Sequence, residues 1–216
     1  MKIRAIKIGS SFFLHILLPV AMCVFFFVSA ARAFGDEIFQ AIDADDINTV
    51  EVMLDKGKDV NMKNDFGITP LMEAAAAGSV DVARLLIDKR ADVNAQDKDT
   101  GLTPLINAGL MRHADIMRLL IEKGADVNAK TKDGTTALML AAADGFEDIV
   151  RILIKKDADV KAVDNGGHNV LAWAERSAKP AITRILKRAG AKKIKNIEAV
   201  PKGSISKMRG SLQGRE

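Results

Sequence analysis

The sequence is poor in the residues from which most enzyme and metal sites are built. Its 216 residues include three His, one Trp, no Tyr and a single Cys, Cys23. One thiol cannot form an intrachain disulfide, and it cannot supply the Cys ligands of a zinc ribbon. So few imidazoles and thiols also disfavour Cys nucleophiles and most His-based acid–base catalysis. We therefore expect one ordinary domain that is not an enzyme and that needs no metal and no cofactor.

The first 33 positions lack acidic residues, yet they hold four basic residues and five of the nine Phe. Three of the basic residues precede a mostly apolar run at residues 12–31. Ala31-Arg32-Ala33 then has the small-x-small pattern that signal peptidases cleave. We interpret residues 1–33 as a helical signal peptide that is cleaved after Ala33, which would make the mature chain periplasmic or secreted.

An uncleaved anchor is the alternative for this segment, because about 20 apolar residues can span a bilayer. His15 and Pro19 would weaken such a helix. In this alternative the protein stays in the inner membrane as a tethered scaffold.

The rest of the chain repeats with a period of about 33 residues. Gly67-Ile68-Thr69-Pro70-Leu71 is followed by three similar segments that begin at Gly101, Gly134 and Gly167. Two further columns keep this register, an Ala column (Ala74, Ala108, Ala141, Ala174) and a Leu column (Leu86, Leu120, Leu153, Leu186). A more irregular first copy fits the same pattern. We expect a repeat domain over residues 34–192, with copies at about 34–64, 65–97, 98–130, 131–163 and 164–192.

Each recurring residue has a local physical role. Thr69, Thr103 and Thr136 can cap a helix start, and the Pro that follows two of them suits the first helical position. Small Ala side chains let helices approach closely, and apolar positions of the second helix recur at helical spacing. Each copy is therefore predicted to be a helix-turn-helix unit with a hairpin loop. Stacked copies would form an all-α solenoid with one continuous core.

These motifs resemble the ankyrin repeat. The resemblance covers about residues 36–192 and rests on Gly67-x-Thr69-Pro70-Leu71, Ala74-Ala75, Leu85-Leu86 and Ala91-Asp92-Val93-Asn94. With the leader, it indicates an exported protein of the bacterial periplasmic type. We expect four full or nearly full copies preceded by a half copy that acts as a cap.

The sequence departs from the family pattern in two places. The slot after Leu, often His in ankyrin repeats, holds Met72, Ile106, Met139 and Ala172. The Gly that commonly ends the first helix becomes Arg112 in the third copy. A left-handed backbone would cost a non-Gly residue roughly 1 kcal/mol there.

The remaining candidates for chemistry have structural interpretations. Residues 97–101 resemble the start of a calcium loop but lack its sixth-position Gly and its closing Glu, so we interpret them as an insertion in a turn. His113 matches a position that often holds a structural His in ankyrin repeats, and we expect His168 to be solvated at a turn tip. The catalytic alternative is an enzyme built from His113, Asp144 and Glu147.

The resemblance also implies a binding surface, because ankyrin repeats bind proteins through their loop tips and the exposed side of their first helices. We assign an unidentified protein partner to this surface. The residues at matching positions are Asp65, Phe66, Ile68, Asp99, Thr100, Leu102, Leu110, Met111, Lys132, Asp133, Asp144, His168 and Arg176.

Five of these residues are apolar and would form a patch across the second and third copies, namely Phe66, Ile68, Leu102, Leu110 and Met111. Contiguous patches of this kind are typical of interaction sites. The alternative is that some of these side chains tuck between the repeats. We interpret Trp173 as a cap on the last copy rather than a binding hot spot, because a large aromatic side chain covers apolar surface well.

Charge divides the chain. Residues 34–186 carry 19 basic and 26 acidic residues, whereas residues 187–216 carry nine basic and two acidic ones. The tail at 193–216 is rich in Lys, Ser and Gly, so we expect it to be disordered. It could contact an anionic membrane surface weakly or stay solvated, and export argues against nucleic acid.

Together these patterns predict an exported, monomeric, non-catalytic module that binds a partner protein through the ankyrin groove and loop tips. The alternatives are a periplasmic immunity-type inhibitor of a toxic enzyme, a membrane-tethered scaffold and an enzyme.

Overall fold

A computed structural model describes residues 37–177, 179–194 and 200. The predicted signal peptide and most of the basic tail lie outside these residues. The described residues form ten α-helices and a short 3-10 helix, and no strand. They are α2 (Glu37–Asp43), α3 (Ile47–Asp55), α4 (Pro70–Ala77), α5 (Val80–Asp88), α6 (Pro104–Met111), α7 (Ala114–Glu122), α8 (Ala137–Asp144), α9 (Glu147–Lys155), α10 (Val170–Ala174), η1 (Glu175–Ser177) and α11 (Pro180–Arg188).

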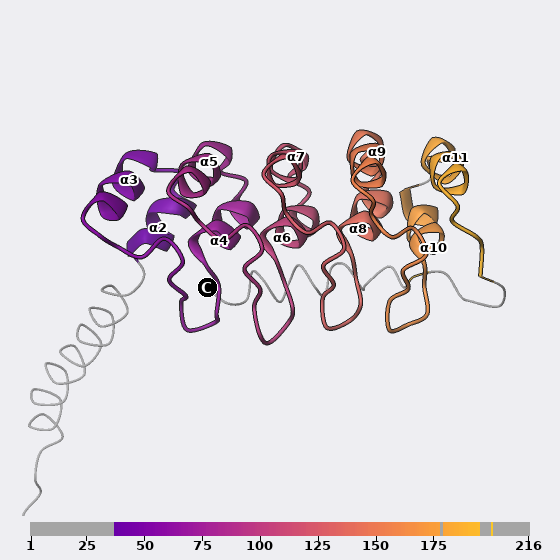
Figure 1. Ribbon diagram of the computed structural model, residues 1–216, viewed down its shortest axis with the longest axis horizontal. Coiled ribbons are helices and arrows are strands. Elements are labelled where there is room, and N and C mark those ends of the chain that lie inside the picture. Colours follow the sequence, from indigo (N-terminus) through magenta and orange to yellow (C-terminus); the bar gives the residue numbers. More distant parts are fainter. Residues whose placement is uncertain (1–36, 178, 195–199, 201–216) are drawn as a thin grey trace, which may run out of the picture. The chain divides into compact units, whose positions relative to one another are not determined.

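The helices from Ile38 onward form antiparallel pairs that stack side by side (Figure 1). The first helices of the pairs, α2, α4, α6, α8 and α10, make an inner row beside the loops. The second helices, α3, α5, α7, α9 and α11, make an outer row, and long loops project from the inner side (Figure 1). This arrangement confirms the predicted all-α solenoid of helix-turn-helix units.

The first copy contains both of its helices, so the expectation of a half copy was wrong. Ile38 and Ile42 of α2 and Val50 of α3 are fully buried in the core. A complete amphipathic pair covers the open side of the second copy better than a half copy would, and it leaves no inner helix without an outer partner.

The repeated Thr and Pro residues start the inner helices as predicted. The hydroxyl of Thr69 accepts a hydrogen bond from the backbone N–H of Met72, and Thr103 and Thr136 make the equivalent bond. Each bond measures 3.3 Å. Pro70 and Pro104 occupy the first helical position, where a missing N–H costs nothing.

A left-handed residue ends three of the inner helices. Gly78 and Gly145 have φ angles of 89° and 83°, and Arg112 adopts the same conformation at φ 70°. The Nε atom of Arg112 lies 3.5 Å from a carboxylate oxygen of Asp144 in the next copy. This ion pair offsets part of the free energy that a left-handed backbone costs a non-Gly residue.

The predicted Leu and Ala columns form the continuous core. Leu86, Leu120, Leu153 and Leu186 are fully buried, one in each of α5, α7, α9 and α11. The Ala column at residues 74, 108, 141 and 174 is buried between neighbouring helices. The hydrophobic face of each copy is thus covered by its neighbours.

A ladder of Asn side chains joins adjacent copies at the ends of the outer helices. The Oδ1 atoms of Asn61, Asn94 and Asn128 accept the backbone N–H of Asp92, Asp126 and Asp159 in the next copy, each at 2.7 Å. Their Nδ2 atoms donate to carbonyl oxygens of the next copy. The ladder therefore joins each of the first three copies to the one that follows it.

Candidate partner-binding face

The predicted binding residues lie on two structural features. Nine of them lie in the loops between helix pairs, namely Asp65, Phe66, Ile68, Asp99, Thr100, Leu102, Lys132, Asp133 and His168. Leu110 and Met111 lie in the last turn of α6, Asp144 ends α8, and Arg176 lies in η1.

The predicted apolar patch is wrong for three of its five members. Ile68 and Leu102 are 4% exposed and Leu110 is 1% exposed, so none of them offers a side chain to a partner. Ile68 and Leu102 directly precede the Thr caps, where they pack into the core between adjacent copies. Met111 is half-buried, whereas Phe66 is 44% exposed. The alternative that these side chains tuck between repeats holds for the buried three.

A side-chain acceptor at the base of each loop fixes its shape. The Oδ1 atom of Asn64 accepts the backbone N–H of Phe66 and of Ile68, both at 3.0 Å. Asp97 accepts the N–H of Asp99 at 2.9 Å in the next copy, and Thr131 accepts the N–H of Thr135 at 3.0 Å. This column was missed from sequence because Asn, Asp and Thr share an acceptor atom rather than a residue type.

The loops also hold one another in register. The N–H of Lys132 donates to the carbonyl of Thr100 at 2.8 Å, and the N–H of Asn165 donates to the carbonyl of Asp133 at 2.9 Å. A Cβ on Gly101, whose φ is 74°, would lie 3.0 Å from the nitrogen of Lys132, so only Gly fits this close approach. The turn interpretation of residues 97–101 agrees with this geometry.

The exposed loop tips carry one carboxylate in each of three successive copies. Asp65, Asp99 and Asp133 are all exposed, and Lys98 and Lys132 accompany the second and third of them. Phe66 stands beside the first. Phe66 is therefore an exposed aromatic side chain at one end of a charged row.

His168 is not solvated, contrary to expectation. Its side chain is 14% exposed, and its Nδ1 lies 3.0 and 3.2 Å from the two carboxylate oxygens of Asp164. The same carboxylate accepts the indole N–H of Trp173 at 2.9 Å. Trp173 is buried, which agrees with a capping role and leaves it unable to act as an exposed hot spot.

The residues of the catalytic alternative do not converge. A ring nitrogen of His113 lies 3.0 Å from the carbonyl oxygen of Ala76, which matches the structural role expected for it. Glu147 pairs with Arg151 at 2.8 Å, and Asp144 pairs with Arg112. The described part of the chain contains no cluster of three His, Cys, Asp or Glu residues that could hold a metal ion.

Two described residues, Asp46 and Lys89, have shifted pKa values, and both lie at the ends of outer helices. The hydroxyl and N–H of Thr49 donate to Asp46 at the start of α3 and lower the pKa of that carboxyl. The carboxylate of Asp55 raises the pKa of Lys89 on the outer row. Both groups belong to helix capping and surface pairing rather than to a site.

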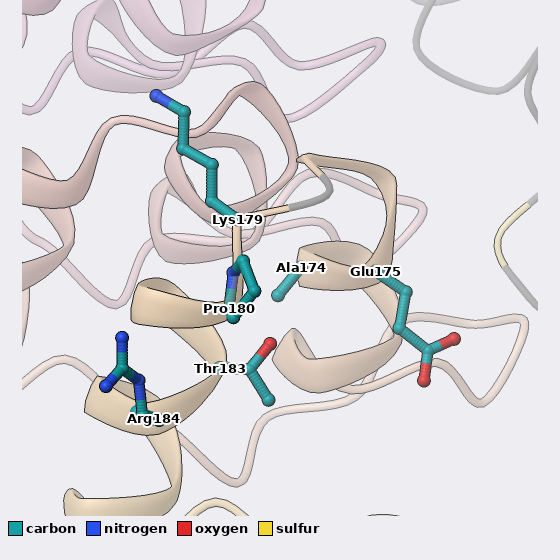
Figure 2. Close-up of a pocket in the computed structure, with 6 residues that line it drawn as sticks. All are labelled: Ala174, Glu175, Lys179, Pro180, Thr183 and Arg184. Carbon is teal, nitrogen blue, oxygen red and sulfur yellow. The ribbon is translucent and has the colours of Figure 1, made fainter.

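An open pocket of about 390 Å³ lies beside the last pair of helices. It is lined by Ala174, Glu175, Lys179, Pro180, Thr183 and Arg184 (Figure 2). The charged side chains of Glu175, Lys179 and Arg184 point away from one another (Figure 2), and Lys179 donates to the carbonyl of Gly145 at 2.8 Å. The pocket therefore lacks the converging polar groups that orient a small ligand.

The fold and the exposed loops define a repeat protein that presents an interaction surface. The sequence matches the family described as Ankyrin repeats (3 copies) over residues 38–131 and 128–197, and the chain belongs to that family. None of the helices in the described ranges is long and apolar enough to span a membrane.

The chain is similar to three curated ankyrin-repeat proteins over short stretches. The chain is 50% identical over 46 residues to the ankyrin repeat and KH domain-containing protein mask of Drosophila melanogaster, which covers 21% of the chain and 1% of that protein. It is equally similar to the human ankyrin repeat and KH domain-containing protein 1, over 21% of the chain and 2% of that protein. It is 39% identical over 62 residues to the rat (Rattus norvegicus) ankyrin repeat and SAM domain-containing protein 6, over 28% of the chain and 7% of that protein. The chain thus spans a small fraction of these relatives.

Proposed function

We propose that this protein is a non-catalytic module that binds one partner protein through the tips of its loops. The observation that carries this proposal is the exposed Phe66 beside the charged row of Asp65, Asp99 and Asp133. Ankyrin repeats indicate protein–protein interaction as the general role. The partner would offer an apolar pocket for Phe66 with a polar rim around it, the usual anatomy of an interface.

Rigid presentation is the proposed mechanism. The hydrogen bonds of Asn64 and the contacts between loops order the tips before any partner arrives. A preordered surface loses little conformational entropy on association, so a small apolar anchor can yield useful affinity.

We further propose that the protein acts as a monomer in a bacterial periplasm, after cleavage of residues 1–33. The composition of the leader and its Ala31-Arg32-Ala33 triplet support this placement. The mass of the purified protein tests it, because cleavage would leave a chain that begins at Phe34. A mass that includes residues 1–33 would favour the tethered scaffold instead.

The binding surface is tested by comparing which envelope proteins are captured by the immobilised wild type and by the immobilised Phe66→Asp variant. We expect the partner to be lost, because a truncated hot spot costs at least about tenfold in affinity and a charge costs more. Val163→Asp is the matched control, since Val163 lies in the last loop and is 43% exposed against 44% for Phe66. Equal capture by the folded Phe66→Asp variant and the wild type would reject this surface.

A further inference from the structure

The loop between α9 and α10 contains an Asn followed by a Gly (Figure 1). Asn165 precedes Gly166, and no other Asn of the sequence precedes a Gly. Both residues are exposed. They occupy the two central positions of a turn, which the N–H of Gly167 closes by donating to the carbonyl of Asp164 at 2.9 Å. The pair is therefore open to solvent and held in a local turn.

An Asn side chain can lose ammonia when the backbone nitrogen of the next residue attacks it. At this position the nitrogen of Gly166 would form a bond to Cγ of Asn165 while the bond from Cγ to Nδ2 breaks. The proton of the Gly166 N–H leaves with Nδ2 as ammonia, and a five-membered succinimide ring remains. Water then opens the ring at either carbonyl carbon and leaves Asp or isoaspartate. Gly favours the attack because it has no Cβ to crowd the nitrogen.

Asn128 in the preceding loop is a reference within the same molecule. It is exposed, and its Nδ2 donates to a backbone carbonyl at 3.1 Å, as that of Asn165 does at 2.8 Å. Its next residue is Ala129, whose N–H donates to the carbonyl of Asp126 at 3.4 Å. The N–H of Gly166, by contrast, makes no hydrogen bond with another described residue. The two Asn side chains are thus held alike, and the attacking nitrogen is more available at Asn165.

Asn165 also fastens the last loop to the loop before it. Its Nδ2 donates to the carbonyl of Lys132, and its N–H donates to the carbonyl of Asp133 at 2.9 Å. A carboxylate has no proton to donate, so the first of these bonds would become a repulsion between two oxygens. Isoaspartate would also lengthen the main chain by one methylene beside the second bond. The first two loops hold Asp65 and Asp99 at the same register, so the turn itself accepts the Asp product.

We propose that Asn165 is a site of spontaneous deamidation and that its conversion releases the last loop from the loop before it. The reaction needs only water and the atoms of this chain. It adds a further carboxylate to the loop tips and loosens the loop that carries it. This inference goes beyond partner binding and does not require it.

Peptide mapping of the purified protein tests the site. The protein is incubated at mildly alkaline pH and digested with trypsin, and the mass gained when an amide becomes an acid is measured over time. Fragment ions separate Asn165 from Asn169, which lies in the same peptide. We expect Asn165 to convert at least about ten times faster than Asn128, a difference of about 1.4 kcal/mol in activation free energy.

Asn165→Gln is the matched control for the chemistry. Its longer side chain would have to close a six-membered ring, so the mass gain should disappear from this position while Asn128 behaves as in the wild type. Conversion of Asn165 no faster than that of Asn128 would overturn the site.

Hydrogen exchange followed by NMR tests the release of the loop. Asn165→Asp supplies the product directly, and its N–H at position 165 should exchange about tenfold faster than in the wild type, as expected for a loss of about 1.4 kcal/mol of local stability. The matched control is Asp99→Asn, the reverse change at the same register of the second loop, and it should leave exchange in that loop unchanged. Unchanged exchange in Asn165→Asp would overturn the release. Both tests use the free protein, so their results are independent of partner capture by Phe66.

Discussion

The interior copies and the last copy are attached to their neighbours in different ways. Between interior copies, Asn61, Asn94 and Asn128 make the same pair of hydrogen bonds at each junction. At the junction of the fourth copy with the last one the corresponding slot holds Lys161, which does not continue the ladder. The inner helix of the last copy, α10, has five residues and passes into the 3-10 helix η1 without a left-handed cap.

Local side-chain bonds replace the ladder in the last copy. Asp164 accepts hydrogen bonds from both His168 and Trp173, and Asn169 replaces Thr as the helix cap. A copy with a neighbour on one side only must cover its own open face. The interior is thus stabilised by periodic bonds between copies, whereas the last copy adds bonds within itself to the contacts that it keeps with the fourth copy, such as Lys179 to Gly145.

The largest effect is expected from breaking the interior. Leu120→Asp places a carboxylate in the fully buried seam between α5, α7 and α9. Burying an unpaired charge costs many kcal/mol, more than a small domain can lose. Circular dichroism should show loss of the cooperative melt. Glu122→Asp, an exposed change on the same helix, is the control and should melt like the wild type.

The periodic part of this architecture could be predicted from the sequence because each repeated residue acts locally. The Thr caps, the Pro at the first helical position and the buried Leu column all depend on neighbours a few residues away or one copy away. The left-handed Arg112 followed from its register with Gly78 and Gly145.

The binding face was harder to predict because exposure depends on packing between copies. Register alone assigned Ile68, Leu102 and Leu110 to the surface, whereas their apolar side chains are buried in the core. The contact of His168 with Asp164 was missed because it required a carboxylate four residues upstream to turn back within a loop. Val200 is 4% exposed although it lies after the last copy, and no equivalent residue in the other copies could have indicated that it is buried.

An intermediate effect is expected from the cap of the last copy. Trp173→Ala removes a large buried side chain and the bond to Asp164, a change that costs about 3–5 kcal/mol. Hydrogen exchange should show faster exchange in α10 and α11 while α5 and α7 stay protected, because repeats are stabilised by their nearest neighbours. Trp173→Phe keeps most of the packing and should lose far less. Uniform loss of protection along the whole stack would contradict a cap that acts locally.

The smallest effects are expected from changes to the Asn ladder. Asn128→Ala removes two bonds between the third and fourth copies. These bonds are exposed, so the free energy of unfolding should fall by about 1–2 kcal/mol.

Lys161→Asn extends the ladder by one step, because its register places the new side chain near the backbone of Lys192, as Asn128 lies near Asp159. Urea unfolding should show a gain no larger than the loss from Asn128→Ala, and the gain should be confined to the last copy. A loss of stability in Lys161→Asn would mean that the end of the stack cannot accept the interior pattern and that Asp164, His168 and Trp173 hold it in a different geometry.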